Sequence, residues 1–346
     1  MTLQAALDRI VASESRHRDV HEIALGVLDG KTLTHACRGD WQGNPVGPET
    51  PFLIASTSKL FISAMIFQLV AEGRLTLADP VTNFFPGELD RLHVWKGTDL
   101  TGRITLRHLL CHTSGLADYF EGQRHDGGSL AKDMFAGKDR AYGLSEVLGW
   151  VRDEMRPVFA PGTGRRAFYS DTNFYLLAEI VARAGGEGLD AALSRRITVP
   201  IGLTRTCFFK PGMSVLPLRL GTKVVEAPLA LASMPGDGGA VSCLQDLAHF
   251  TKVFFEGGLF PKLLLDDLSP YRRIFFPLRA GTGVLRFAVP RWLPPFRSGL
   301  EFTGHSGISG TVAFLSRANG RIIVGTVNQL QDRARPYRMM MKAGMA

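Results

Sequence analysis

The sequence predicts an α/β protein: an antiparallel sheet built from both ends of the chain, with flanking helices and an inserted, mostly helical lobe. Residues 23–28 and 32–37 are apolar runs joined by an Asp-Gly turn, and residues 311–315 and 322–327 are joined by an Asn-Gly turn. Such dipeptides between apolar runs are strong signals for β-hairpins. Hairpins at opposite ends of the chain suggest strands of one sheet, and the helical patterns between them predict layered α/β architecture.

The expected helices follow from apolar residues that recur with a period of about 3.6. Residues 1–10 form an amphipathic pattern, and residues 335–343 give a last helix that we expect to pack on the sheet. The helices expected between them include residues 58–72, 106–111, 144–152, 172–184 and 243–255. We expect a single domain over residues 1–346, with an α/β lobe of about residues 1–58 and 235–346 and a helical lobe of about residues 59–234.

The composition, 45% hydrophobic and 21% charged, is typical of a globular protein. A net charge of +8 favours acidic partners, but no zinc-finger spacing or RNA-binding motif accompanies it, so we expect no nucleic-acid partner. No apolar run is long enough to span a membrane, so we expect no membrane partner. The N-terminal residues carry charges where a signal peptide would be apolar, which favours a cytoplasmic protein. His and Cys do not cluster at metal-ligand spacing, so we expect no metal and no cofactor.

The first candidate site is the segment Ile-Ala-Ser-Thr-Ser-Lys-Leu at residues 54–60, which opens an almost entirely apolar helix. Ser56 and Lys59 are three residues apart, and such residues share one face of a helix. A cation on the first turn of a buried helix loses its proton more easily, so Lys59 is expected to activate the Ser56 hydroxyl as a nucleophile. The plain alternative is that the Ser/Thr cluster only caps the helix.

Two further segments carry polar groups at element ends. Tyr169 ends an extended stretch and precedes a helix capped by one of the next three residues, so its phenolate would be placed to deprotonate a serine. Residues 304–310 read Gly-His-Ser-Gly-Ile-Ser-Gly before a strand, and glycines in a strand allow close approach of a ligand. The alternatives are a half-buried aromatic with ordinary helix caps, and a flexible turn.

Together these segments resemble the serine β-lactamase and penicillin-binding superfamily, in its class C branch. The matching order is Ser56-x-x-Lys59, then Tyr169-x-Asp171, then His305-x-Gly307. Residues 104–116, which contain Leu-Leu-Cys-His-Thr-Ser-Gly-Leu, and residues 161–163 and 238–242 are also similar to that group. The resemblance covers roughly residues 20–330. It implies the β-lactamase-like serine hydrolase fold.

The resemblance also implies roles for individual residues. Ser56 would form an acyl-enzyme, with Lys59 and Tyr169 as general base and then acid. The backbone N–H groups of Ser56 and Ile308 would form the oxyanion hole. Substrate would contact four residues: Asp171, His305, Ser306 and Gly307. His112, Thr113 and Ser114 would hold the helical lobe near the site, and no metal ligand is implied.

Two positions depart from the penicillin-active pattern of that superfamily. Asp171 stands where many relatives have asparagine, and a carboxylate accepts hydrogen bonds where an amide would donate one. His305 stands where many relatives have a permanently charged lysine, and a histidine is only partly charged near neutral pH. Both changes weaken the case for β-lactams or terminal D-alanyl peptides and favour the esterase and amidase relatives.

Residues 271–300 are unusual because they hold six arginines, several prolines and no acidic residue. Their aromatic residues are Tyr271, Phe275, Phe276, Phe287, Trp292 and Phe296. One hypothesis is a wall of the cleft, with Arg286 and Arg291 for an acidic substrate group and rings for an acyl chain. The alternative is a surface loop whose aromatic side chains pack into the core.

The leading functional hypothesis is a serine hydrolase that acts on small-molecule carboxylic esters. The alternatives are a D-amino-acid peptidase or amidase, a β-lactamase, or an acyltransferase using the same acyl-enzyme. A non-catalytic binding protein is a further alternative, which the presence of Ser56, Lys59 and Tyr169 argues against. The expected partner is a small-molecule ester or amide, and the sequence does not indicate an oligomeric state.

Overall fold

An eight-stranded antiparallel sheet is the main element of the computed structural model, which describes residues 1–266, 271–290 and 299–346. Its strand order is β12-β13-β14-β15-β16-β17-β1-β2. The bounds are β1 (Ile23–Asp29), β2 (Thr32–Arg38), β12 (Arg272–Phe275), β13 (Leu278–Ala280), β14 (Leu285–Val289), β15 (Leu300–Gly307), β16 (Thr311–Ser316) and β17 (Ile322–Thr326). Strand β1 pairs with β17, Ala24 opposite Thr326, so the two ends of the chain meet inside one sheet as the sequence predicts.

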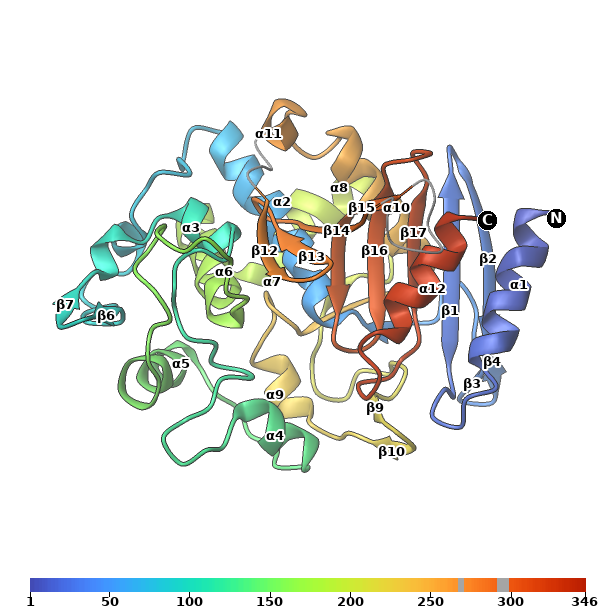
Figure 1. Cartoon of the computed structure of the whole chain (residues 1–346), viewed down its shortest axis with the longest axis horizontal. Helices are drawn as coiled ribbons and strands as arrows, with labels where there is room; N and C mark the ends of the chain where they lie inside the picture. The colour runs from blue at the N-terminus through green and yellow to red at the C-terminus, as the bar shows by residue number, and fades with distance from the viewer. Residues whose placement is uncertain (267–270, 291–298) are drawn as a thin grey trace.

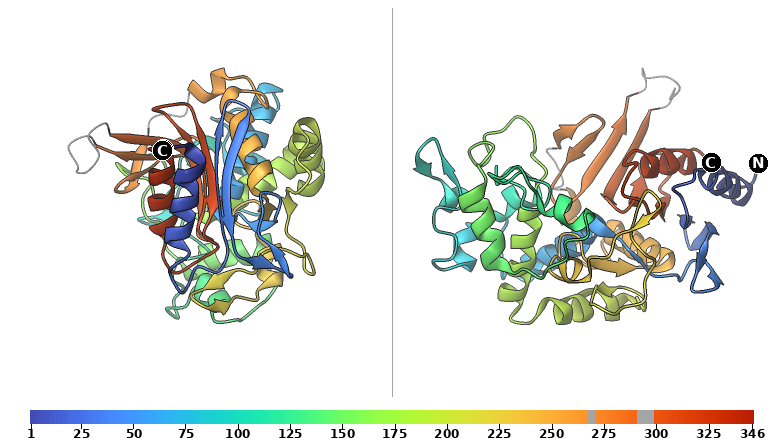
Figure 2. Two further views of the ribbon diagram at one scale, coloured as in Figure 1. Left: turned by 90° about the vertical axis from the view of Figure 1, so that its right-hand side faces the viewer. Right: turned by 90° about the horizontal axis from the view of Figure 1, so that it is seen from below.

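Helices cover both faces of this sheet. Helices α1 (Leu3–Glu14) and α12 (Arg335–Gly344) lie side by side on one face, and α10 (Leu244–Glu256) packs against β1, β16 and β17 on the other (Figures 1 and 2). Helix α2 (Ser58–Ala71) is apolar nearly all round, and its side chains are buried on every face, as expected for a core helix.

The remaining helices lie mostly in the part of the chain between β2 and β11, at the far end of the molecule from the two termini (Figure 1). They are α3 (Leu106–Leu110), α4 (Leu130–Phe135), α5 (Leu144–Gly149), α6 (Asp171–Gly185), α7 (Leu189–Leu193), α8 (Val199–Ile201), α9 (Pro228–Ala232) and, after α10, α11 (Leu263–Asp266). The shorter helical turns are η1 (Ala55–Thr57), η2 (Val81–Phe84), η3 (Thr101–Arg103), η4 (Trp150–Glu154) and η5 (Ser194–Thr198).

Small strand pairs complete the structure. Strands β5 (Phe52–Leu53), β11 (Ala240–Ser242) and β8 (Cys207–Phe208) form a three-stranded sheet beside the start of α2. The other pairs are β3 (Asp40–Trp41) with β4 (Asn44–Pro45), β6 (Val94–Trp95) with β7 (Thr98–Asp99), and β9 (Arg219–Leu220) with β10 (Lys223–Val224). In the described ranges, no helix combines the length and the apolar character needed to cross a bilayer.

Most of the elements predicted from periodicity are confirmed within two residues. The first helix runs to Glu14 instead of residue 10, and the helix expected at residues 144–152 changes to a π-turn at Trp150. The alternative of a surface loop for residues 271–300 is wrong where the structure describes them, because they form β12, β13, β14 and the start of β15. Arg291, Trp292 and Phe296 lie outside the described residues. The lobe boundaries near residues 58 and 235 stay a prediction.

Candidate active site

Ser56 and Lys59 meet where the turn η1 passes into α2. Lys59 Nζ donates a hydrogen bond to Ser56 Oγ over 3.0 Å, and the lysine side chain is fully buried. Ala55 has a φ of +45°, an uncommon conformation for a residue with a side chain, and it places Ser56 at a sharp corner. Thr57, at the N-cap of α2, makes no side-chain capping bond. The predicted pairing of the two residues is therefore present, and capping does not explain the segment.

The ammonium of Lys59 is surrounded by acceptors from distant parts of the chain. Nζ donates to the carbonyl oxygen of Asp237 over 2.5 Å and lies 2.5 Å from Asp171 Oδ1. Burial alone would lower the pKa of Lys59, but the negative charges of Asp171 and its neighbours outweigh burial and raise that pKa above its ordinary value. The expectation that Lys59 loses its proton easily is therefore wrong for the free protein, because the sequence did not show these counter-charges.

Tyr169 is half-buried beside the same ammonium, which lies 5.2 Å from its ring centroid, and is held by the loop after α3. The rings of His112 and Tyr169 stack with centroids 4.4 Å apart, and His112 Nδ1 accepts the N–H of Ser170 over 3.2 Å. Burial raises the pKa of the Tyr169 phenol despite the attraction of Lys59, so the resting phenol is neutral. Ser114 Oγ donates to Asn173 Oδ1 over 2.6 Å, which ties the same loop to α6.

The N-terminus of α6 is capped from outside the helix. The cap expected from Ser170, Asp171 or Thr172 is absent, because the N-cap residue Ser170 makes no side-chain capping bond. The hydroxyls of Ser170 and Thr172 both donate to the carbonyl oxygen of Ala117. Asp118 Oδ1 accepts the N–H of Asp171 over 2.9 Å instead. No sequence motif marks Asp118 or Asp237 as residues of the site. The available signal for Asp118 was a carboxylate inside the apolar run at residues 116–120.

Strand β15 approaches Ser56 closely because residue 307 has no side chain. A Cβ added at Gly307 would lie 2.4 Å from the carbonyl oxygen of Ile54 and 2.9 Å from the Ala55 Cβ. The pairing of β14 with β15 stops at Gly304, so residues 305–307 pair with β16 only. Ser306 Oγ bonds Tyr337 of α12. The predicted His-x-Gly motif therefore ends in glycine because a side chain at this position would clash with the backbone before Ser56.

His305 is placed differently from the expectation. Its ring is buried, 6.2 Å from the Tyr169 ring, and Nδ1 contacts the backbone of Ser306. Burial, reinforced by the charge of Lys59, lowers the pKa of His305 to about 3. The imidazole is thus neutral, where the sequence suggested a partly charged group, and it cannot replace the permanent charge of a lysine.

A cavity of about 740 Å³ opens above Ser56. Its polar wall includes Tyr169, Asp171 and Ser306, and it also includes Gly307 and Ile308. Four further charged residues line it: Asp118, Glu121, Arg333 and Arg338. Among the described residues, His305 is the expected substrate contact that this wall does not contain. The apolar part is contributed by Phe120, Ala167, Phe168, Ile274, Phe275, Phe276, Pro277, Leu278, Leu285, Phe287, Val289 and Met341. The arrangement places the hydroxyl of Ser56 beside Lys59 and Tyr169 at one end of a largely apolar cleft.

Comparison with known proteins gives the family. The family model described as Beta-lactamase matches residues 7–341. The chain belongs to the beta-lactamase family. It is 27% identical over 270 residues to "Putative penicillin-binding protein PbpX" of Bacillus subtilis, covering 76% of this chain and 59% of that protein. It is 32% identical over 217 residues to "Esterase EstB" of Burkholderia gladioli, covering 60% of this chain and 52% of that protein.

Solved structures agree on the fold. The D-amino acid amidase from Ochrobactrum anthropi SV3, complexed with D-phenylalanine, superposes with a TM-score of 0.79 at 21% identity, covering 99% of this chain and 98% of that chain. This likeness shows the beta-lactamase-type α/β fold that the sequence predicted. The chain spans only a little over half the length of the curated relatives it matches, 59% of PbpX and 52% of EstB.

A second, smaller pocket in this beta-lactamase family member also reaches Ser56. Ser56, Asp171, Asp237 and Ile308 line it together with apolar side chains. Asp237 Oδ2 accepts the hydroxyl of Tyr119 over 2.6 Å, whereas Oδ1 is buried without a hydrogen-bond partner. Burial raises the pKa of Asp237 to about 8. In the part of the chain that the structure describes, His, Cys, Asp and Glu side chains form no group of three that could hold a metal ion.

The arginine hypothesis for residues 271–300 is only half supported. Leu285, Phe287 and Val289 of β14 face the cavity above Ser56, as expected for aromatic and apolar wall residues. Arg286 alternates to the opposite face of the strand, where it forms a 2.6 Å ion pair with Glu301. Arg286 therefore does not face the nucleophile.

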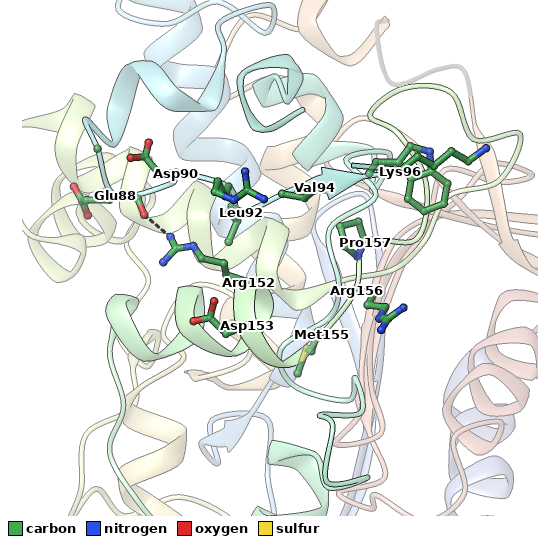
Figure 3. A pocket seen from close by; sticks show the side chains of 13 residues that line it. Glu88, Asp90, Leu92, Val94, Lys96, Arg152, Asp153, Met155, Arg156 and Pro157 are labelled. Atoms are coloured by element: carbon green, nitrogen blue, oxygen red, sulfur yellow. Dashed lines mark hydrogen bonds between the residues drawn. The ribbon is translucent and has the colours of Figure 1, made fainter. Parts of the chain in front are cut away.

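Another hollow, of about 730 Å³, lies beside β6 and is drawn in Figure 3. Its walls mix acids such as Glu88 and Asp153 with bases such as Lys96 and Arg156. Arg152 reaches the backbone carbonyl of Glu88 across it. None of the residues that carry the family motifs lines this hollow, so the site is assigned to the cavity at Ser56.

Proposed function

We propose that the protein is a serine hydrolase that forms an acyl-enzyme on Ser56 and acts on carboxylic esters of small molecules. The observation that carries the proposal is the 3.0 Å contact of Ser56 Oγ with Lys59 Nζ at the base of an apolar cavity of about 740 Å³. A nucleophile within hydrogen-bond reach of an oriented proton-transfer group is the general signature of covalent catalysis.

The proposed reaction uses groups that already surround Ser56. Ser56 Oγ attacks the ester carbonyl, Lys59 and Tyr169 transfer the proton, and the leaving alcohol departs with a proton. The backbone N–H groups of Ser56 and Ile308, two residues that both line the cavity, would stabilise the oxyanion. Water then hydrolyses the acyl-enzyme.

Esters are favoured over β-lactams and terminal D-alanyl peptides by the polar groups near Ser56. Neutral His305 offers no fixed positive charge for a substrate carboxylate, and the carboxylate of Asp171 cannot donate to a substrate amide carbonyl. Most of the remaining wall is apolar, which suits an uncharged acyl or alcohol group. The two arginines that line it are already ion-paired, Arg333 with Glu121 and Arg338 with Asp332.

A D-amino-acid amidase is the second candidate. The observation that favours it is the smaller pocket beside Ser56, where the carboxylate of Asp171 would face a substrate ammonium group. An amide of an amino acid carries such a group next to its reacting carbonyl. This candidate predicts turnover only of substrates with a free amino group.

The test compares wild type with Ser56→Ala on a short-chain p-nitrophenyl ester, a D-amino-acid p-nitroanilide and a chromogenic cephalosporin. Ester turnover that disappears in Ser56→Ala is expected, whereas Ser13→Ala, on the exposed face of α1, should leave it unchanged. Preference for the anilide would favour the amidase. Product that forms only when an alcohol acceptor is added would indicate an acyltransferase. A wild type whose Ser56 fails to react with a fluorophosphonate would refute the proposal and favour a binding protein.

A further inference from the structure

Asp171 is linked to Ser56 through Lys59. Ser56 Oγ is 3.0 Å from Lys59 Nζ, and Lys59 Nζ is 2.5 Å from Asp171 Oδ1. Asp171 is the first residue of α6, and Asp118 accepts its backbone N–H. This hydrogen bond holds the backbone that carries the Asp171 carboxylate. It also lines both cavities at Ser56, with about 10% of its side chain exposed.

The resting site needs a proton acceptor that neither Lys59 nor Tyr169 supplies. An ammonium has no lone pair, and a neutral phenol is a poor base, so neither can take the proton of Ser56 directly. Lys59 must first release a proton. Asp237 offers the ammonium only its backbone carbonyl oxygen, because its side chain is turned to the hydroxyl of Tyr119. Asp171 is the carboxylate that Nζ contacts among the described side chains.

The remaining charged groups around Asp171 come from several elements. Asp118 and Glu121 lie on the loop before α4. Arg333, just before α12, pairs with Glu121. Asp118 accepts three backbone N–H groups, those of Phe120, Glu121 and Asp171, and its oxygens do not bond Lys59. These groups set the local charge, but none of them bridges to the Ser56–Lys59 pair.

We propose that Asp171 is the proton acceptor for acylation of Ser56, a role distinct from the substrate contact expected from the sequence. A proton moves from Lys59 Nζ to Asp171 Oδ1, leaving a neutral amine and a neutral carboxylic acid. The amine then takes the proton of Ser56 as the Oγ–C bond forms, which regenerates the ammonium. When the tetrahedral intermediate collapses, the C–O bond to the alcohol breaks, the alcohol leaves with a proton from the ammonium, and Asp171 returns its proton to Lys59. The inference rests on the proposed function.

The substitution Asp171→Asn tests this step, since the amide keeps the shape of the side chain but cannot take up the proton. We expect kcat for the p-nitrophenyl ester to fall about 100-fold, within the usual range for loss of a general base, with KM changed less than about threefold. The second-order rate of fluorophosphonate labelling of Ser56 should fall in parallel. Asp171→Glu, which retains a carboxylate on a longer arm, should recover part of the lost rate.

Chemical rescue separates proton transfer from a purely structural role. In Asp171→Gly, added formate should restore kcat at least tenfold, whereas formate should not accelerate wild type or Asp171→Asn. An Asp171→Asn variant that keeps kcat within threefold of wild type would overturn the inference. If that variant does not fold, an Asp171→Gly variant that folds and is not rescued by formate would overturn it equally. If the wild type hydrolyses the ester and Ser56→Ala does not, the proposed function holds even when the Asp171 variants overturn the role of Asp171. The two proposals can therefore fail independently.

Discussion

The two walls of the Ser56 cavity are built on different principles. The inner wall presents polar groups, the half-buried Tyr169 and the buried Asp171, with the fully buried Lys59 directly behind them; they are carried by α2, by α6 and by the segment before α6. The outer wall consists of apolar side chains on β12–β14 and α12, and two of them, Phe275 and Phe276, are each 57% exposed. The comparison teaches that reactive groups need a rigid, desolvated setting, whereas groups that receive the substrate can remain at the surface.

The two walls should therefore respond differently to substitution. Removing one partner of a buried ion pair leaves an uncompensated charge, which typically costs about 3 kcal/mol or more. Truncating a half-exposed aromatic side chain removes contact area for a ligand and little folding energy. Changes in the inner wall should thus alter both turnover and stability, and changes in the outer wall should alter selectivity alone.

The largest expected effect is that of Lys59→Met. Turnover should fall about 1000-fold because the proton relay is lost. The free energy of unfolding should fall by about 3 kcal/mol because the carboxylate of Asp171 loses its partner. Urea unfolding and ester kinetics measure the two effects. The double variant Lys59→Met/Asp171→Asn should regain stability without activity, and equal stability of wild type and Lys59→Met would contradict the picture of an ion-paired inner wall.

The next effect concerns the contact between β15 and η1. Gly307→Ala would place a Cβ 2.4 Å from the carbonyl oxygen of Ile54, so the strand must move away from Ser56. We expect kcat to fall about 100-fold, as when an oxyanion-hole donor is displaced. Gly102→Ala is the matched control, since a Cβ there meets no atom within 4 Å. Unchanged kcat in Gly307→Ala would show that the close approach is not needed for turnover.

The outer wall is tested by Phe275→Ala. KM for p-nitrophenyl esters with long acyl chains should rise about tenfold, in line with the loss of one apolar contact, while KM for the acetate should not change. Thermal unfolding should match wild type, because the ring is already largely exposed. Leu263→Ala on α11, also exposed, serves as the control. Equal changes of KM for short and long esters would argue against an acyl-binding wall.

The smallest effect on turnover, and a clear one on stability, concerns His305. Its pKa is about 3 in the folded protein against about 6.5 when unfolded, so its contribution to stability is complete above pH 6.5 and is lost as the pH falls toward 3. Between pH 6.5 and 5 this amounts to about 2 kcal/mol. His305→Asn should remove that part of the pH dependence in urea unfolding. An unaltered slope would mean that His305 does not titrate as a buried neutral group.

The comparison with His305→Asn is needed because other groups in the inner wall act with the opposite sign. Burial raises the pKa of Asp118 to about 7 and that of Asp237 to about 8. Their contribution is complete below the unfolded pKa of about 3.9 and is lost as the pH rises through these folded values. Subtracting the unfolding free energy of His305→Asn from that of wild type at each pH cancels the contributions of Asp118 and Asp237. What remains is the contribution of His305.

The sequence predicted the local features of the site well. The spacing of Ser56 and Lys59, the apolar run of α2 and the turns at Gly30 and Gly320 each depend on a few neighbouring residues, and the structure contains all of them. The sequence did not predict β12–β14, because prolines and arginines are typical of loops as well as of strands near a sheet edge. The alternation of Leu285, Arg286 and Phe287 was the signal that identifies β14.

The chain by itself determined which reactive side chains are present and which of them share a helical turn, because those relations are set by backbone geometry over a few residues. The charge of those groups, in contrast, depends on contacts between distant parts of the chain. Lys59 is held as an ammonium by Asp171 and by the carbonyl oxygen of Asp237, 178 residues away in sequence, and His305 is neutral because the same ammonium and burial disfavour a second positive charge. Ionisation depends on solvation and on charges within a few ångströms, and those neighbours are brought together only by the fold.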